Sequence, residues 1–173
     1  MTFTLYAATI PSYQQIITAV DRLLDKAVAF AAEKGMSEAD LVALRLYEDM
    51  LPFAYQVKSV VEHSVGAIEG VRAGSYSPAT GPFPTDFATL KAKLADAKAF
   101  LAGLDPAEVE SFIGRDMKFV FGTMQMPFTA ENFLLSFAQP NFYFHATTAY
   151  DILRANGVKI GKRDFTGMPR IKT

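Results

Sequence analysis

Apolar residues recur at intervals of three and four over much of this chain, the spacing that one buried face of an α-helix requires. The first such pattern predicts a helix over residues 11–33, with Pro11 in its first turn and Gly35 just after its end. Ser37 is followed by acidic residues and is typical of a helix N-cap, so a short helix is expected to run from there to about Leu44. The chain therefore begins with a long helix and a short one.

Two more long helical patterns occupy the middle of the chain. The second long helix is predicted from residue 52 or 53 to residue 72, and it ends before Gly74. A loop rich in Ser, Pro and Gly over residues 75–84 leads to the third helix, which Thr85 caps and which extends to about residue 102. Asp105 is followed by proline and then by glutamate at the third position, which predicts a short helix to about residue 112.

The last third of the chain changes character before it becomes helical again. Residues 117–128 are rich in aromatic and β-branched side chains, which predicts an extended segment or one arm of a small hairpin. A final long helix is predicted over residues 129–156, with Gly157 as its stop. Pro140 lies inside this pattern and lacks a backbone donor, so a kink is expected directly before Asn141.

Four long helical segments with short additions predict an all-α fold. We expect an up-down four-helix bundle, with a short extended or β-hairpin insertion before the last helix. At 173 residues the chain is long enough to bury one core, and the sequence contains no repeats or linkers that would divide it. A single domain over residues 1–173 is therefore expected.

Composition narrows the function classes. Half of the residues are hydrophobic, with 15 Phe and 7 Tyr, which is typical of a well-packed globular core. The absence of cysteine excludes disulfides, zinc sites built on thiolates and cysteine nucleophiles. A formal net charge of -1 gives no basic patch for nucleic acid. Neither a signal peptide nor a long apolar run is evident, so we expect a cytoplasmic protein that makes no membrane contact.

The candidate chemistry lies in two helices. Asn141 and His145 are one helical turn apart and share a face in the last helix. In the second helix, Gln56, Ser59 and His63 form a polar stripe without a charged side chain, which indicates a partly buried network rather than a solvated face. Two core helices that each carry one of the two histidines predict a common pocket between them.

The same residues allow two interpretations. Neutral imidazole is a common ligand for divalent metal ions, and Asp49 or Glu62 is available as an additional carboxylate ligand or base. A well-held zinc ion usually has three or four protein ligands, however, and the chain offers only two histidines. The alternative is a structural network in which His63 and His145 hydrogen-bond each other or nearby hydroxyl groups.

Two runs of sequence resemble a known family. These are LYEDMLPFAYQVKSVVEHSVGAIEGV and LSFAQPNFYFHATTAYDILRANGVKIGKRDF, of which NFYFHxTTAYDILR and GKRDF are the most specific parts. They are similar to an uncharacterised bacterial and fungal family known only as a domain of unknown function. That family is grouped with the DinB/YfiT-like superfamily of four-helix bundles, many of which are expected to be metalloenzymes. The resemblance covers nearly the whole chain.

The resemblance implies a metal site with one altered ligand. In the wider superfamily three histidines bind a divalent metal, one from the second helix and two placed four apart on the last long helix. His63 and His145 match two of these positions, and Asn141 stands at the third. Members with the full set include transferases and isomerases that use low-molecular-weight thiols. The implied cofactor is a divalent metal such as Zn or Ni, held by His63 and His145.

Three functional hypotheses follow. The first is an uncharacterised DinB-like protein with a polar core pocket that binds an unidentified small molecule or retains a degenerate metal site. Six residues are expected to line or adjoin this pocket: His63, Asn141, His145, Gln56, Ser59 and Tyr150. The second is a divalent-metal-dependent transferase or hydrolase that uses His63 and His145. The third is a structural or partner-binding helical bundle. The many aromatic residues also suggest a homodimer.

Overall fold

The computed structural model of the protein describes residues 3–172. Helix α1 spans Leu5–Lys34, so it begins well before the start predicted at Pro11. The Thr4 side chain accepts a hydrogen bond from the first turn, and the Glu110 carboxylate accepts from the first two amides of the helix at 3.2 and 2.8 Å. These acceptors satisfy backbone donors that a helix start leaves unpaired. Glu110 is distant in sequence, so the local pattern did not reveal this start.

The shorter elements follow the predicted order. Helix α2 spans Glu38–Val42 after its N-cap, and α6 spans Pro106–Glu110 with an aspartate N-cap, both as predicted. Helix α5 spans Phe87–Ala102, and its N-cap is Asp86 rather than the predicted Thr85. The Asp86 carboxylate accepts a hydrogen bond of 2.7 Å from a backbone amide of the first turn, which a carboxylate does at least as well as a hydroxyl.

The second and last long helices each contain a π-helical turn. The second consists of α3 Phe53–Val61, the π turn η1 Glu62–Gly66 and α4 Ala67–Ala73. The last consists of α7 Ala130–Asn132, the π turn η2 Phe133–Ala138 and α8 Gln139–Ala155. The helical run continues through Pro140, and η2 ends directly before α8 begins. The predicted kink before Asn141 corresponds in position to this wide turn, which changes the backbone pairing where the proline has no donor.

A small three-stranded sheet closes one end of the molecule. Strands β2 Asp116–Phe121 and β3 Met124–Thr129 form the antiparallel hairpin predicted before the last helix. Strand β1, Ser75–Tyr76, pairs in parallel with β2 and lies in the segment predicted to be a loop. Two residues carry no readable strand pattern, and their pairing depends on a strand far along the chain. That is why the sequence did not indicate β1.

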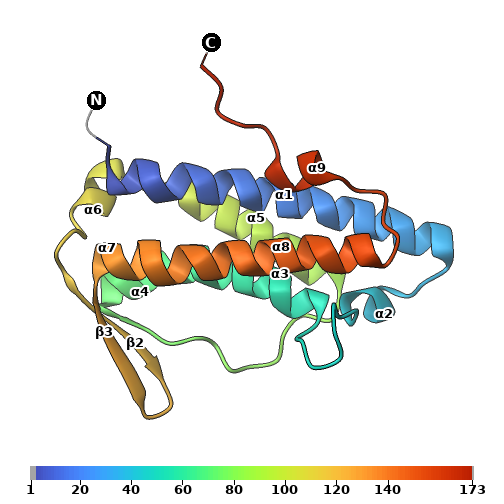
Figure 1. Ribbon diagram of the computed structural model, residues 1–173, viewed down its shortest axis with the longest axis horizontal. Coiled ribbons are helices and arrows are strands. Elements are labelled where there is room, and N and C mark those ends of the chain that lie inside the picture. Colours follow the sequence, from blue (N-terminus) through green and yellow to red (C-terminus); the bar gives the residue numbers. More distant parts are fainter. Residues whose placement is uncertain (1–2, 173) are drawn as a thin grey trace.

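Figure 1 shows the long helices side by side, with the sheet at one end. Helix α1 packs against α5 and α8, and α3 packs against α8 and α5. The segment between β1 and α5, residues 77–86, runs along α3, and a short unpredicted helix, α9 Lys162–Thr166, packs on α1. The protein is therefore mostly helical with a small sheet, which confirms the coarse part of the predicted fold, and β1 adds a third strand to the predicted hairpin.

No helix within residues 3–172 combines the length and the apolar character that a membrane crossing needs.

Two glycines on one helical face set the distance to Tyr76. A Cβ atom added to Gly70 would lie 2.8 Å from the Tyr76 Cβ, whereas one added to Gly66 would lie 3.6 Å from a Tyr76 ring carbon. Alanine at either position brings a similar gain in helix propensity, about 1 kcal/mol. Overpacking of this kind costs about 1–3 kcal/mol. We therefore expect Gly70→Ala to be less stable than Gly66→Ala by about that amount in urea denaturation. Equal stabilities would contradict the close contact with β1.

Candidate functional site

The two histidines meet in the core between α3–η1 and α8. Their ring centres are 5.4 Å apart and the ring planes differ by only 11°, so the imidazoles stack. His63 comes from the π turn η1 and is 9% exposed, while His145 comes from α8 and is half-buried. Turns of this wide type are rare in proteins as a whole, but those that occur are often found at functional sites. The predicted juxtaposition of the two histidines is present.

Gln56 fixes the protonation pattern of His145. The His145 Nδ1 lies 2.7 Å from the Gln56 Oε1, and the Gln56 Nε2 donates to the Leu51 carbonyl at 2.8 Å. Because the amide nitrogen is committed to a carbonyl, the amide oxygen must face the histidine and accept from it. His145 therefore carries its proton on Nδ1 and presents the lone pair of Nε2. An outer partner that sets the tautomer in this way is typical of histidines that bind a ligand through the other nitrogen.

Both imidazoles are neutral at physiological pH. Burial, with smaller contributions from His145 and the Lys58 ammonium, lowers the pKa of His63 to about 4. Burial, followed by Lys58, lowers the pKa of His145 to about 4 as well. Within residues 3–172 the buried His63 Nδ1 has no hydrogen-bond partner. The unpaired His63 Nδ1 and the lone pair of the His145 Nε2 are therefore both available for hydrogen bonds to a bound molecule.

A buried ion pair borders the histidines. Lys58 is 8% exposed, and its Nζ lies 2.8 Å from the Glu62 Oε1 and donates to the Ala79 carbonyl at 3.0 Å. The ammonium also lies 5.3 Å from the centre of the Tyr55 ring, in cation–π range. Sequence analysis noted Glu62 but missed Lys58. The spacing of Lys58 and Glu62, four residues apart on one helix, was the signal that could have found the pair. We call Gln56, Lys58, Glu62, His63 and His145 the histidine cluster.

Aromatic side chains enclose this cluster. Tyr76 of β1 and Phe137 of η2 lie with ring centres 5.9 and 6.1 Å from that of His63. The Tyr55 and Phe144 rings lie 5.9 and 5.3 Å from that of His145. Sequence analysis did not connect Tyr76 with the site, because the contact depends on the unpredicted strand β1. Low-polarity walls strengthen every hydrogen bond and charge interaction inside them.

The remaining predicted site residues divide into two groups. Asn141 donates from its Nδ2 to the Phe137 carbonyl at 2.7 Å, so its Oδ1 is its remaining acceptor. It lies one turn from both Phe137 and His145, whose rings contact that of His63. Ser59 is buried on α3, one turn from Gln56 and one from His63. Tyr150 instead packs its ring against Phe165 of α9, at 5.9 Å.

The histidine cluster falls short of a well-held zinc or nickel site. The part of the chain that the structure describes contains no group of three His, Cys, Asp or Glu side chains that could hold a metal. Asn141 stands at the third position that the resemblance implies, and its amide oxygen is a poor zinc ligand. The donor set is therefore incomplete for the implied metal.

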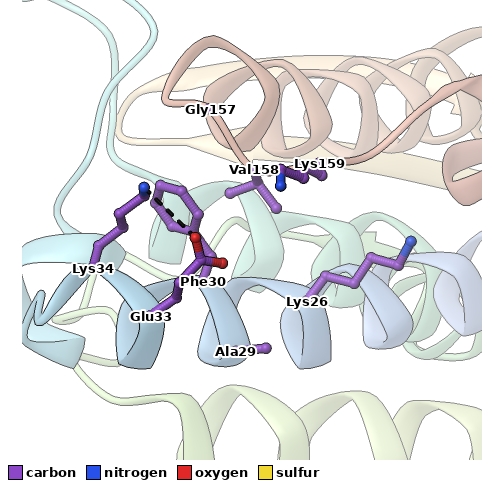
Figure 2. Close-up of a pocket in the computed structure, with 8 residues that line it drawn as sticks. All are labelled: Lys26, Ala29, Phe30, Glu33, Lys34, Gly157, Val158 and Lys159. Carbon is purple, nitrogen blue, oxygen red and sulfur yellow. Dashed lines mark ion pairs between the residues drawn. The ribbon is translucent and has the colours of Figure 1, made fainter.

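Two surface hollows adjoin the helices. One of about 410 Å³ is lined by Glu62, Gly66, Tyr76 and Ala79 among others, so it opens beside the histidine cluster. Figure 2 shows the residues that line another hollow, among them Lys26, Phe30, Lys34 and Lys159. The volume of this hollow is about 300 Å³. The second hollow shares no lining residue with the cluster. Lys34 lies in the last turn of α1, where a positive charge interacts favourably with the helix dipole, so its presence there does not require a ligand.

Comparison with known proteins places the chain in a family. A family model described as a domain of unknown function, DUF1993, matches residues 5–166. No curated protein sequence matches the chain. The crystal structure of a DinB family member protein from Shewanella denitrificans is similar, with a TM-score of 0.80 and 26% sequence identity over 98% of this chain and 95% of that chain. The chain thus belongs to the DUF1993 family of domains of unknown function, and its fold is DinB-like.

Proposed function

We propose that this DinB-like domain, an up-down four-helix bundle, binds a small molecule at the histidine cluster. One observation carries the proposal: a buried imidazole and a half-buried one, both neutral, stack beside each other, and the buried Nδ1 of His63 has no hydrogen-bond partner in the described part of the chain. Buried polar groups in native proteins are nearly always paired, so such an atom calls for a specific explanation. A ligand that supplies the missing hydrogen bond is that explanation.

The arrangement of the neighbours supports binding rather than packing alone. Gln56 holds His145 in the tautomer that presents the Nε2 lone pair, and aromatic rings enclose the pair. A hydrogen-bond network built only for stability would use both nitrogens of each ring. A prepared acceptor enclosed by apolar rings is the arrangement of a small-molecule site, in which few polar groups fix the orientation of the ligand.

A fragment titration tests the proposal. With only two histidines, a protein carrying ¹³C-labelled histidine gives two Hε1 signals, one for each ring. Molecules in a library of small polar fragments are expected to shift both signals to saturation. Gln56→Leu should weaken that binding about tenfold, because it removes the partner that sets the His145 tautomer. Gln139→Leu is the matched control, since Gln139 donates to Ala8 instead. A library without any fragment that shifts both signals would refute the proposal.

Elemental analysis of untagged protein separates this function from a metal-dependent transferase or hydrolase. We expect substoichiometric Zn and Ni that does not change in His145→Ala, because the donor set has only two imidazoles. One ion per chain that is lost in His145→Ala would favour the metal-dependent enzyme. A purely structural or partner-binding bundle predicts a third result: His63→Ala and Asn141→Ala would alter stability, and no fragment would bind.

A further inference from the structure

Two buried polar atoms beside the histidine cluster lack partners, and they come from different elements. The Tyr76 hydroxyl and the His63 Nδ1 have no hydrogen bond within residues 3–172, although Tyr76 is 5% exposed and His63 is 9% exposed. Their ring centres are 5.9 Å apart. Each unpaired buried group of this kind costs stability, and two on neighbouring rings are unusual. Their proximity points to one missing molecule rather than to two separate defects.

The Tyr76 side chain is held in place against the helix. Its Cβ lies against Gly70 and a ring carbon lies near Gly66, so the ring runs along the helix toward the turn that carries His63. The Phe133 ring centre is 5.5 Å from that of Tyr76, and β1 fixes the backbone opposite Phe119. Because packing defines the position of this ring, the hydroxyl is a preorganised group.

The charges around the cluster select an uncharged ligand. The Lys58 ammonium disfavours a cationic ligand, and the Glu62 carboxylate disfavours an anionic one. Because these two charges already pair with each other, neither needs a charged ligand as its partner. Burial, with Glu62 and Tyr55 adding in the same direction, raises the pKa of Tyr76, so its hydroxyl keeps its proton and can donate. His145 presents an acceptor. The complementary group must therefore accept one hydrogen bond and donate another without carrying a charge.

We propose that Tyr76, His63 and His145 together bind an uncharged group that both donates and accepts hydrogen bonds, such as the primary carboxamide of a small molecule. This inference rests on the proposed function and adds Tyr76 and the ligand class to it. The hollow of about 410 Å³ lined by Tyr76 and Glu62 gives the rest of the ligand a place beside the cluster.

Three probes of one shape and different charge test the ligand class. Acetamide, acetate and acetamidinium are titrated into the ¹³C-histidine-labelled protein at pH 7.5, and the two Hε1 signals are followed. Acetamide is expected to shift both signals and to bind at least tenfold more tightly than either ion. Tighter binding of acetate or acetamidinium, or no shift with acetamide, overturns the inference. The proposed function survives that result where other fragments of the library still shift both signals.

Two tyrosine variants test the role of Tyr76. Tyr76→Phe removes only the hydroxyl and should weaken acetamide binding at least fivefold. Tyr13→Phe is the matched control, because Tyr13 is also buried, its hydroxyl is unpaired within the described residues, and it packs against Phe142 instead. That variant should bind acetamide as the wild type does, and both variants should melt no lower than the wild type. Unchanged binding in Tyr76→Phe, or a lower melting temperature, overturns the assignment.

Discussion

Lowering the pH from 6.5 to 5 is expected to destabilise the protein by roughly 1–2 kcal/mol for each histidine. In the folded state the pKa of both His63 and His145 is about 4, below the ordinary value of 6.5. Between these values the unfolded chain binds more protons than the folded one, so protons favour unfolding. Stability is therefore complete above pH 6.5 and falls as the pH drops toward 4.

Urea denaturation at pH values from 5.0 to 7.5 measures this loss. Keeping the lowest pH at 5 leaves the carboxylates ionised, so the slope reports the histidines. The double variant His63→Gln with His145→Gln should lose most of the pH dependence, and each single variant should lose part of it. NMR titration gives an independent reading, since both histidine signals should stay in their neutral positions down to about pH 5. A midpoint near 6.5 for either ring would contradict its burial.

Phe142→Ala is expected to cost about 3–5 kcal/mol, which makes it among the most damaging single substitutions in the chain. The Phe142 side chain is fully buried in α8, and its ring centre lies 4.7 Å from that of Tyr13 in α1. Truncation removes this edge-to-face contact and leaves a cavity between two long helices. The surrounding side chains cannot fill that cavity unless α1 and α8 shift relative to each other.

The neighbouring Phe144 provides the control. It lies on the same helix but is 56% exposed, so Phe144→Ala should change the unfolding free energy by no more than about 0.5 kcal/mol. Urea denaturation of both variants at pH 7.5 gives the comparison. Similar losses in the two variants would mean that the assigned faces of α8 are wrong.

The sequence predicted the features that depend on helical periodicity. The three-and-four spacing located the long helices, and the same spacing placed Asn141 with His145 and Gln56 with His63. Because the two polar faces lie on helices that pack together, the two histidines lie close to each other as predicted, although their stacking was not foreseen. Gln56 was predicted as a neighbour, although its effect on the His145 tautomer required the Leu51 carbonyl to be located.

The missed features depend on contacts between distant parts of the chain. Tyr76 reaches His63 only because β1 pairs with β2, and two residues are too few to show a strand pattern. The start of α1 depends on Glu110, which caps it from another helix. The Tyr150 ring lies 5.9 Å from that of Phe165, a contact that depends on α9, which the sequence analysis did not predict. Long-range partners of this kind leave no local trace in one sequence.

The π turn η1 ties the chemistry of His63 to the length of its helix. A π turn holds an additional residue compared with an α-helical turn of the same rise. Deleting one residue within Glu62–Gly66 would therefore restore ordinary helical pairing and leave the residues beyond the turn on the faces that they occupy now. Gly70 would still face Tyr76, whereas the direction of the His63 side chain would change. Homologous chains with a single-residue gap at this point should therefore keep a small residue at the position of Gly70 and differ at the position of His63.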